Sequence, residues 1–403
     1  MAAATAQGDS FWDEIDHLTT KLQRENRTKQ TVNPGSHIGG IKDAPYKQTT
    51  RSEVIKKIEF FIEGLLTKLA QNNLPDIQFK NRRSWANMSF IDDVGVEMNG
   101  NATETTIKLN SNYSIQKYAK TLKILRIAHG LLQENVYSTK REIYYNDVPF
   151  FGNQATVDHI VDDISCMFNL PRHALHILAC SKGYVSGKLS FREHDGNLID
   201  CNVNPNGILI PTHIHGIYNI CSDAKAILVV EKDATYQRLL DDDILEKLYP
   251  IIMITGKGFP DLNTRVLVKR LWESLEIPVL ALVDTDPHGV EIMCVYRFGS
   301  MSQSYDTDNL AVPSMRWIGV LPSDLERLSI NKEAQIPLTE QDRKKISQLL
   351  DRPYVKAHAS IQQELLVLLN TGHKAEMQAL STISTGFITD VFLPIKIKHG
   401  KWI

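Results

Sequence analysis

The sequence lacks the features of a secreted, membrane-bound or strongly charged protein. Its five cysteines are an odd number, lie far apart and form no Cys-x-x-Cys pair, which argues against a zinc site and favours reduced thiols in a cytosolic or nuclear protein. No run approaches the roughly 18 apolar residues of a membrane span, and the N-terminus lacks the basic-then-apolar pattern of a secretory signal. We therefore expect no membrane contact. The net charge of −2 neither indicates nor excludes nucleic acid, because phosphate contacts need only a local basic surface.

At 403 residues the chain has room for two or three domains. The N-terminal part, residues 1–51, is expected to be a peripheral arm. It contains a short helix over 11–22, with Ile15, Leu18 and Leu22 at helical spacing, and a polar linker over 27–51. Because one helix does not bury its apolar face alone, we expect a partner to dock on this arm.

Residues 52–215 predict a winged-helix, DNA-binding domain. Apolar residues at helical spacing indicate helices from Ser52, over 114–133, and through Val157 to Met167. A hairpin then follows, with strands 187–192 and 198–200 joined by a His-Asp-Gly-Asn turn. Short helices followed by a hairpin are typical of folds that place a helix in a DNA groove.

Residues 216–403 predict an α/β domain with a mainly parallel sheet, so the whole chain combines the α/β and α+β classes. Apolar strands alternate here with amphipathic helices. The expected strands are 226–230, 250–255 and 278–283, and the expected helices are 234–247, 262–274 and 288–296.

Three carboxylates follow two of these strands. Glu231 comes directly after the first strand, and Asp284 and Asp286 come after the third. In open parallel sheets functional groups gather at the carboxyl ends of the strands. Oxygen-bearing side chains at one edge suit Mg²⁺, which takes few protein carboxylates and keeps water molecules. Any one of them alone would more often cap a helix, but the Glu with the Asp-x-Asp pair favours a metal site.

A tyrosine pair lies upstream, in Arg141-Glu142-Ile143-Tyr144-Tyr145. A tyrosine has a pKa of about 10 and needs a base or a cation to act as a nucleophile. Arg141 shares one face with Tyr145 in a helix and also in a strand, whereas it shares a face with Tyr144 only in a helix. Geometry therefore favours Tyr145, although this segment alone is more typical of two core aromatic residues.

Other candidates carry weaker signals. Lys182 and Lys257 are candidate phosphate contacts, and Phe259 is a candidate for stacking on a base, although each fits a turn or a packing role as well. The Asp284-Thr285-Asp286 segment also fits a phosphotransferase nucleophile, but a strand with its own glutamate precedes it. No nucleotide triphosphate motif is present.

Taken together, four ordered motifs resemble the A-subunit family of type IIB topoisomerases (topoisomerase VI), and within it the eukaryotic members that act in meiosis. The resemblance covers residues 105–403. It rests on the tyrosine segment 141–145, on Val230-Glu231-Lys232-Asp233-Ala234, on Ile254–Asp261 and on Asp284-Thr285-Asp286-Pro287-His288-Gly289.

The resemblance implies that Tyr145 is the attacking residue, Arg141 its support, and Glu231, Asp284 and Asp286 the Mg²⁺ carboxylates of a toprim domain. It implies a transesterase that makes DNA double-strand breaks to start meiotic recombination through a 5′-phosphotyrosyl link. A homodimer with hybrid sites, a topoisomerase VI B-like subunit in a heterotetramer, meiotic accessory proteins and a nuclear location would follow. Two alternatives stay open: a non-catalytic DNA-binding scaffold, and a metal-dependent toprim nuclease that needs no tyrosine.

Overall fold

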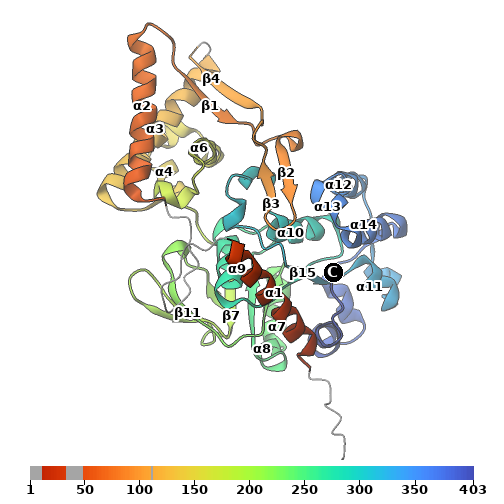
Figure 1. Cartoon of the computed structure of the whole chain (residues 1–403). Coiled ribbons are helices and arrows are strands. Elements are labelled where there is room, and N and C mark those ends of the chain that lie inside the picture. Colours follow the sequence, from red (N-terminus) through yellow and green to blue (C-terminus); the bar gives the residue numbers. More distant parts are fainter. Residues whose placement is uncertain (1–10, 33–48, 110–111) are drawn as a thin grey trace, which may run out of the picture. The chain divides into compact units, whose positions relative to one another are not determined.

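The computed structural model describes residues 11–32, 49–109 and 112–403, which form two compact units (Figure 1). The helical unit comprises residues 45–181 together with the returning segment 298–311, and the α/β unit comprises the remainder. Of the expected N-terminal arm, residues 1–10 and 33–48 lie outside the described residues. The chain thus contributes to the helical unit in two separate stretches.

The helices of the helical unit pack around an apolar core, and a second, smaller apolar cluster lies beside the strand pair formed by residues 76–80 and 104–108. Side-chain caps fix the first turn of four of the five helices. In the first helix, the Thr50 hydroxyl accepts the Glu53 amide, and the Glu53 carboxylate accepts the Thr50 amide in return. The core includes Val54, Ile124 and Ile160. The expected helices are thus present, the first starting after Thr50 rather than Ser52. The helices are α2 (Arg51–Ala70), α3 (Asn112–Glu134), α4 (Lys140–Tyr145), α5 (Val148–Phe151) and α6 (Gln154–Phe168).

Three short strand pairs accompany these helices. Strand β1 pairs antiparallel with β4, β2 pairs antiparallel with β3, and β5 pairs parallel with β6. Sequence periodicity did not predict them, because each is short and only part of each is buried. The strands are β1 (Asp76–Lys80), β2 (Met88–Ile91), β3 (Gly95–Met98), β4 (Glu104–Lys108), β5 (Ser138–Thr139) and β6 (Ile177–Leu178).

Buried charges tie the returning segment 298–311 to the helical unit. Arg82 donates from Nη1 to the Ser302 carbonyl at 2.8 Å and from Nη2 to Asp163 Oδ1 at 2.6 Å. Lys117 Nζ contacts the other oxygen of Asp163 at 2.9 Å. Arg82 belongs to the basic run at 80–83, yet its charge is used inside the fold.

The α/β unit is built on a six-stranded sheet of order β10-β7-β13-β12-β14-β15. The four strands from β13 to β15 in this order are parallel, and β7 and β10 extend the sheet antiparallel, which confirms a mainly parallel sheet. Strands β12 to β14 are buried on both faces, as their continuous apolar runs predict. The strands are β7 (Tyr184–Gly187), β10 (Ile208–Leu209), β12 (Ala226–Val230), β13 (Ile251–Thr255), β14 (Val279–Leu282) and β15 (Arg316–Gly319).

Helices follow the central strands, and more helices complete the C-terminal part. The expected helix over 234–247 is divided in two near Asp242, and the others match within two residues. They are α7 (Asp233–Asp241), α8 (Ile244–Lys247), α9 (Leu262–Leu275), α10 (Pro287–Phe298), α11 (Pro322–Arg327), α12 (Glu340–Leu350), α13 (Pro353–Ala357), α14 (Ala359–Thr371) and α15 (Leu393–Lys398), with the small strand pair β16 (Ile336–Pro337) and β17 (His373–Lys374).

The predicted hairpin forms, but in the α/β unit. Strand β8 (Ser190–Arg192) pairs with β9 (Leu198–Asp200), and β11 (Tyr218–Cys221) pairs with β8. The structure divides the chain at residues 181/182 rather than at 215/216, because β7 pairs with β13 of the main sheet. The hairpin is therefore not a wing of the helical unit, and the winged-helix prediction is not confirmed.

The N-terminal helix α1 (Asp13–Val32) packs within the α/β unit. Its apolar stripe, Ile15, Leu18 and Leu22, is buried, and Asp16 pairs with Lys225 at 2.7 Å. The helix runs beyond Leu22, so the stretch expected as a linker begins as helix. The chain itself covers this apolar face. The expectation that a partner must dock on the helix to bury it therefore does not hold.

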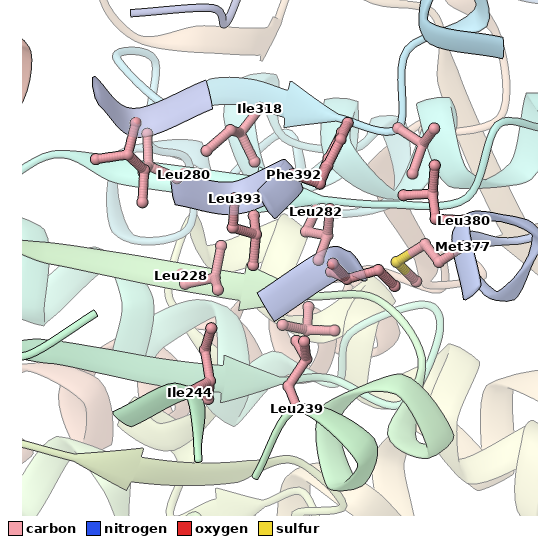
Figure 2. Close-up of a cluster of buried hydrophobic side chains, with 14 of the residues drawn as sticks. Leu228, Leu239, Ile244, Leu280, Leu282, Ile318, Met377, Leu380, Phe392 and Leu393 are labelled. Carbon is pink, nitrogen blue, oxygen red and sulfur yellow. The ribbon is translucent and has the colours of Figure 1, made fainter. Parts of the chain in front are cut away.

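A large cluster of buried apolar side chains lies on the sheet of the α/β unit (Figure 2). It gathers side chains from the central strands, from α7 and α8, and from the C-terminal residues 375–397. Figure 2 labels Leu228, Leu239, Ile244, Leu280, Leu282, Ile318, Met377, Leu380, Phe392 and Leu393 in this cluster. Among the described residues no helix has the length and apolar character to cross a membrane. All five cysteines are free, as predicted.

Candidate active site

The tyrosine pair ends helix α4 of the helical unit. The Thr139 side chain accepts the Glu142 amide at 3.1 Å, which starts the helix, and Tyr145 is its last residue. Tyr145 is 59% exposed, whereas Tyr144 packs against the core of the unit. The two rings lie 5.3 Å apart between centroids. Tyr145 is thus the more accessible of the two tyrosines.

Arg141 lies beside Tyr145, one helical turn earlier. Its guanidinium carbon is 5.7 Å from the centre of the Tyr145 ring, and a hydrogen bond to Tyr145 raises the pKa of Arg141. The helix therefore brings together the two residues that the sequence paired, and their catalytic roles stay predictions.

The three predicted carboxylates lie in the α/β unit, at the carboxyl ends of neighbouring strands. Glu231 follows β12 and Asp284 follows β14, and these strands pair directly. Glu231 Oε2 accepts the Asp284 amide at 2.8 Å. Asp286 Oδ1 accepts the Gly289 amide at 2.6 Å in the first turn of α10. Backbone amides thus orient the carboxylates and leave each a second oxygen.

Burial, with the charges of nearby carboxylates, raises the pKa of two of these groups. Burial and the nearby Asp284 raise the pKa of Glu231 to about 7. Burial also raises the pKa of Asp284 to about 6, although the Met377 amide and Lys232 oppose the shift. Carboxylates with raised pKa values that repel one another gain stability from a cation placed among them.

Two further charged residues belong to this site, and sequence reasoning gave neither a role. Lys232 Nζ lies 2.9 Å from Glu376 Oε2 and 3.8 Å from Asp284 Oδ2. Burial alone would lower the pKa of Lys232, but the hydrogen bond to Glu376 and the charge of Asp284 raise it. Lys232 lies inside one of the four motifs, whereas Glu376 has no local signal, because only the folded chain brings it to Asp284.

The donor set fits a hard divalent cation. Mg²⁺ binds through one or two carboxylates and keeps water molecules, and such a site needs no nitrogen or sulfur ligand. Gly289 has no side chain, and this leaves space beside the carboxylates. A Cβ at this position would meet the Asp284 carbonyl and would lie 2.9 Å from Glu231 Oε2. As the side chains stand, no group of three or more His, Cys, Asp or Glu in the described residues is arranged to hold a metal.

Replacing Gly289 by Ala is expected to weaken divalent-ion binding about tenfold, because the added methyl group meets the Asp284 backbone and Glu231 Oε2 and so displaces two of the carboxylates without removing a ligand. The affinity for Mn²⁺, measured by calorimetry, checks this. Gly130→Ala is the matched control, since a Cβ on Gly130 of α3 meets no atom within 4 Å. Equal Mn²⁺ affinity of the Gly289→Ala variant and the wild type would contradict the predicted site.

The three candidate DNA contacts come together in the α/β unit. Lys182 Nζ donates to the Lys257 carbonyl at 3.2 Å, so both lysines lie by the loop after β13. Lys257 also pairs with Asp233 at 3.0 Å and covers the Tyr184 ring. Phe259 is 45% exposed on the same loop. Their contact with DNA stays a prediction.

Comparisons with known proteins match both units. The family model for the Toprim domain of the topoisomerase 6 A-subunit and Spo11 matches residues 226–397, where the carboxylates lie. The model described as "Type IIB DNA topoisomerase" matches residues 116–177, where the tyrosine pair lies.

Individual relatives align over most of the chain. The "Meiotic recombination protein SPO11" of Homo sapiens is 46% identical over 398 residues, which cover 98% of each chain. The protein of the same name from Mus musculus is 46% identical over 395 residues, again 98% of each chain. The A-subunit of DNA topoisomerase 6 from Arabidopsis thaliana is 40% identical over 291 residues, 72% of this chain and 68% of its own.

Proposed function

We propose a function on the premise that this chain belongs to the family of Spo11 and the topoisomerase VI A-subunits, as its similarity to these proteins shows. Its function is topoisomerase-like formation of DNA double-strand breaks in meiotic recombination. The alternatives of a scaffold and of a tyrosine-independent nuclease are not favoured by these relatives. The observation that carries the proposed chemistry is the exposed Tyr145 beside Arg141 at the end of α4.

The proposed reaction is a transesterification. The Tyr145 oxygen loses its proton, forms a bond to a DNA phosphorus, and the bond from that phosphorus to the 3′-oxygen breaks. The leaving oxygen takes up a proton, and the DNA 5′ end stays linked to the tyrosine. Arg141 stabilises the tyrosinate and the charge on the phosphate oxygens. One phosphoester bond replaces another, so cutting needs no ATP.

Glu231, Asp284 and Asp286 would hold Mg²⁺, the ion that toprim domains generally bind. When bound, the ion supplies positive charge to the phosphate oxygens. The protein's own part is to position these carboxylates through the amides of Asp284, Met377 and Gly289.

The proposed active unit is larger than one chain. We infer that the tyrosine of one protomer works with the carboxylates of another, so that two hybrid sites cut the two strands. We also propose that the chain binds a topoisomerase VI B-like subunit and further meiotic proteins. It would act on chromosomes in the nucleus. Double-stranded DNA is the substrate.

The direct test incubates the purified chain, with its B-like partner, with supercoiled DNA and Mg²⁺. Detergent then traps protein on DNA, and the attached ends are mapped. The proposal predicts cut DNA with protein on both 5′ ends. Cut DNA with free ends would point to a nuclease, and DNA binding without cutting under every condition would point to a scaffold.

Mg²⁺ is expected to stabilise the chain more at about pH 7.5 than at about pH 5.5. Folding raises the pKa values of Glu231 and Asp284 to about 7 and about 6. Between the ordinary carboxylate pKa of about 4 and these values, the folded chain binds more protons than the unfolded chain, so its stability falls as the pH rises. Mg²⁺ replaces those protons and restores the loss. Thermal unfolding with and without Mg²⁺ should differ by at least about 3 °C more at the higher pH. In the Glu231→Gln variant, the Mg²⁺-induced shift of the unfolding temperature should depend less on pH. An equal shift at both pH values in the wild type would refute the prediction.

A further inference from the structure

Lys232 places a permanent positive charge inside the carboxylate site. It directly follows Glu231, and its ammonium lies between two acids, 2.9 Å from Glu376 Oε2 and 3.8 Å from Asp284 Oδ2. The other oxygen of Asp284 accepts the Met377 amide at 2.8 Å. The Asp284 oxygen that is left for a metal is therefore the one that Lys232 faces.

Glu376 is held in this place by the backbone on both of its sides. Before it, Ala375 and Thr285 exchange two backbone hydrogen bonds of 2.9 and 3.1 Å. After it, the Met377 amide binds Asp284. A stretch of the C-terminal region is thus fixed to the residues of the Asp-x-Asp pair, and the position of Glu376 follows from that, although its side chain is 54% exposed.

The charges explain why such a cation is useful. Glu231, Asp284, Asp286 and Glu376 are four acids whose charges act on one another, and Lys232 is the one cation among the described residues that contacts Asp284 in an ion pair. Without it, the metal-free site would hold several carboxylates in partial burial with nothing to balance them, which costs stability.

On the basis of the proposed metal site, we propose that Lys232, anchored by Glu376, is a built-in cation of that site. It balances Asp284 before a metal binds, and it occupies the place between Asp284 and Glu376 that a second divalent ion would need. Glu376 keeps it there when the metal takes the Asp284 oxygen. The pair therefore sets the metal affinity and limits the site to one divalent ion per chain.

Mn²⁺ binding to the full chain tests this, with free Mn²⁺ measured by electron paramagnetic resonance. The wild type should bind one ion. Lys232→Met should bind the first ion about tenfold more tightly and admit a second, because a repelling charge is gone. Glu376→Gln should bind one ion about tenfold more weakly, because Lys232 is then left with Asp284 alone. The double variant should bind one ion with nearly wild-type affinity.

Unfolding of the metal-free chain gives a second measure. Lys232→Met should lower its unfolding temperature, and saturating Mn²⁺ should remove most of that difference. Lys247→Met is the matched control: Lys247 lies in the same unit, is similarly exposed, and pairs with Asp390 at 2.6 Å, away from the metal carboxylates. It should leave Mn²⁺ binding unchanged.

The possible failures are separable. If Asp284→Asn abolishes Mn²⁺ binding while Lys232→Met keeps the wild-type affinity and stoichiometry, the metal site stands and the role of Lys232 is refuted. If Asp284→Asn binds Mn²⁺ like the wild type, the proposed metal site itself fails.

Discussion

A Tyr145→Phe variant is expected to form no covalent protein–DNA complex. The substitution removes a single oxygen, the one that attacks the phosphorus, and leaves the ring beside Arg141 in place. We expect at least about a thousandfold less DNA trapped on protein. Without the attacking oxygen only non-covalent DNA binding remains, and denaturation of the protein releases that DNA. Recovery of end-labelled DNA after denaturation of the protein measures this loss.

Tyr144→Phe is the matched control for that prediction. Tyr144 packs against the core of the helical unit, and phenylalanine keeps its ring. This variant should therefore cut DNA like the wild type. Loss of cutting in the Tyr144 variant, with cutting retained in the Tyr145 variant, would reverse the assignment of the nucleophile. Loss in both with unchanged unfolding temperatures would show that the pair acts together.

The sheet of the α/β unit was predictable because its strands carry a local signal. The runs at 226–230 and 279–282 are apolar without interruption, and each is followed by a helix. Burial on both faces requires such runs. The strands β7 and β10 were not assigned to this sheet, because they join it by antiparallel pairing with strands distant in the chain. Because of that pairing, the boundary between the units lies at residue 181 and not at the predicted residue 215.

The helical unit shows a second limit of local patterns. Its helices were predictable from their apolar spacing, but the returning segment 298–311 was not. Arg82 holds that segment by donating to the Ser302 carbonyl, across 220 positions of sequence. In the sequence, Arg82 is one of three basic residues in the stretch 80–83, and no local pattern gives it a partner. Only the fold shows that the charge is paired with Asp163.

The candidate site divides in the same way. Tyr145 and Arg141 are four residues apart, and Glu231 and Asp284 each follow an apolar strand, so their placement could be reasoned from spacing. Glu376 lies about ninety residues beyond Asp284, in a stretch without a motif. Its position depends on the backbone pairing of Ala375 with Thr285, which no local pattern encodes.

An Asp324→Ala variant is expected to lose about 3–5 kcal/mol of unfolding free energy. Asp324 Oδ2 contacts Lys396 Nζ at 2.8 Å, and both side chains are 2% exposed. Burial lowers the pKa of Lys396, and Asp324 opposes this shift. Without Asp324, the buried ammonium loses the carboxylate it contacts, and the first turn of α11 also loses the bond from the Leu321 amide. Denaturant unfolding of the chain measures the loss.

Lys396→Met should cost less than half as much, because the two partners are not equivalent. Asp324 keeps the Leu321 amide at 3.0 Å and Arg327, which donates to Oδ1 at 2.6 Å from a half-exposed position. Lys396, in contrast, forms no second ion pair with a carboxylate of the described residues. The double variant Asp324→Ala/Lys396→Met should be more stable than Asp324→Ala alone, since it removes the uncompensated charge.

The pH dependence distinguishes this cause from simple loss of packing. A lysine whose folded pKa lies below its unfolded value makes the folded chain bind fewer protons, so stability rises with pH between the two values. Removing Asp324 lowers the folded pKa of Lys396 further and widens that range. The deficit of Asp324→Ala should therefore shrink as the pH rises toward about 10, near the ordinary lysine pKa. A deficit that stays constant with pH, and that the double variant shares in full, would mean that a cavity rather than an unpaired charge destabilises the chain.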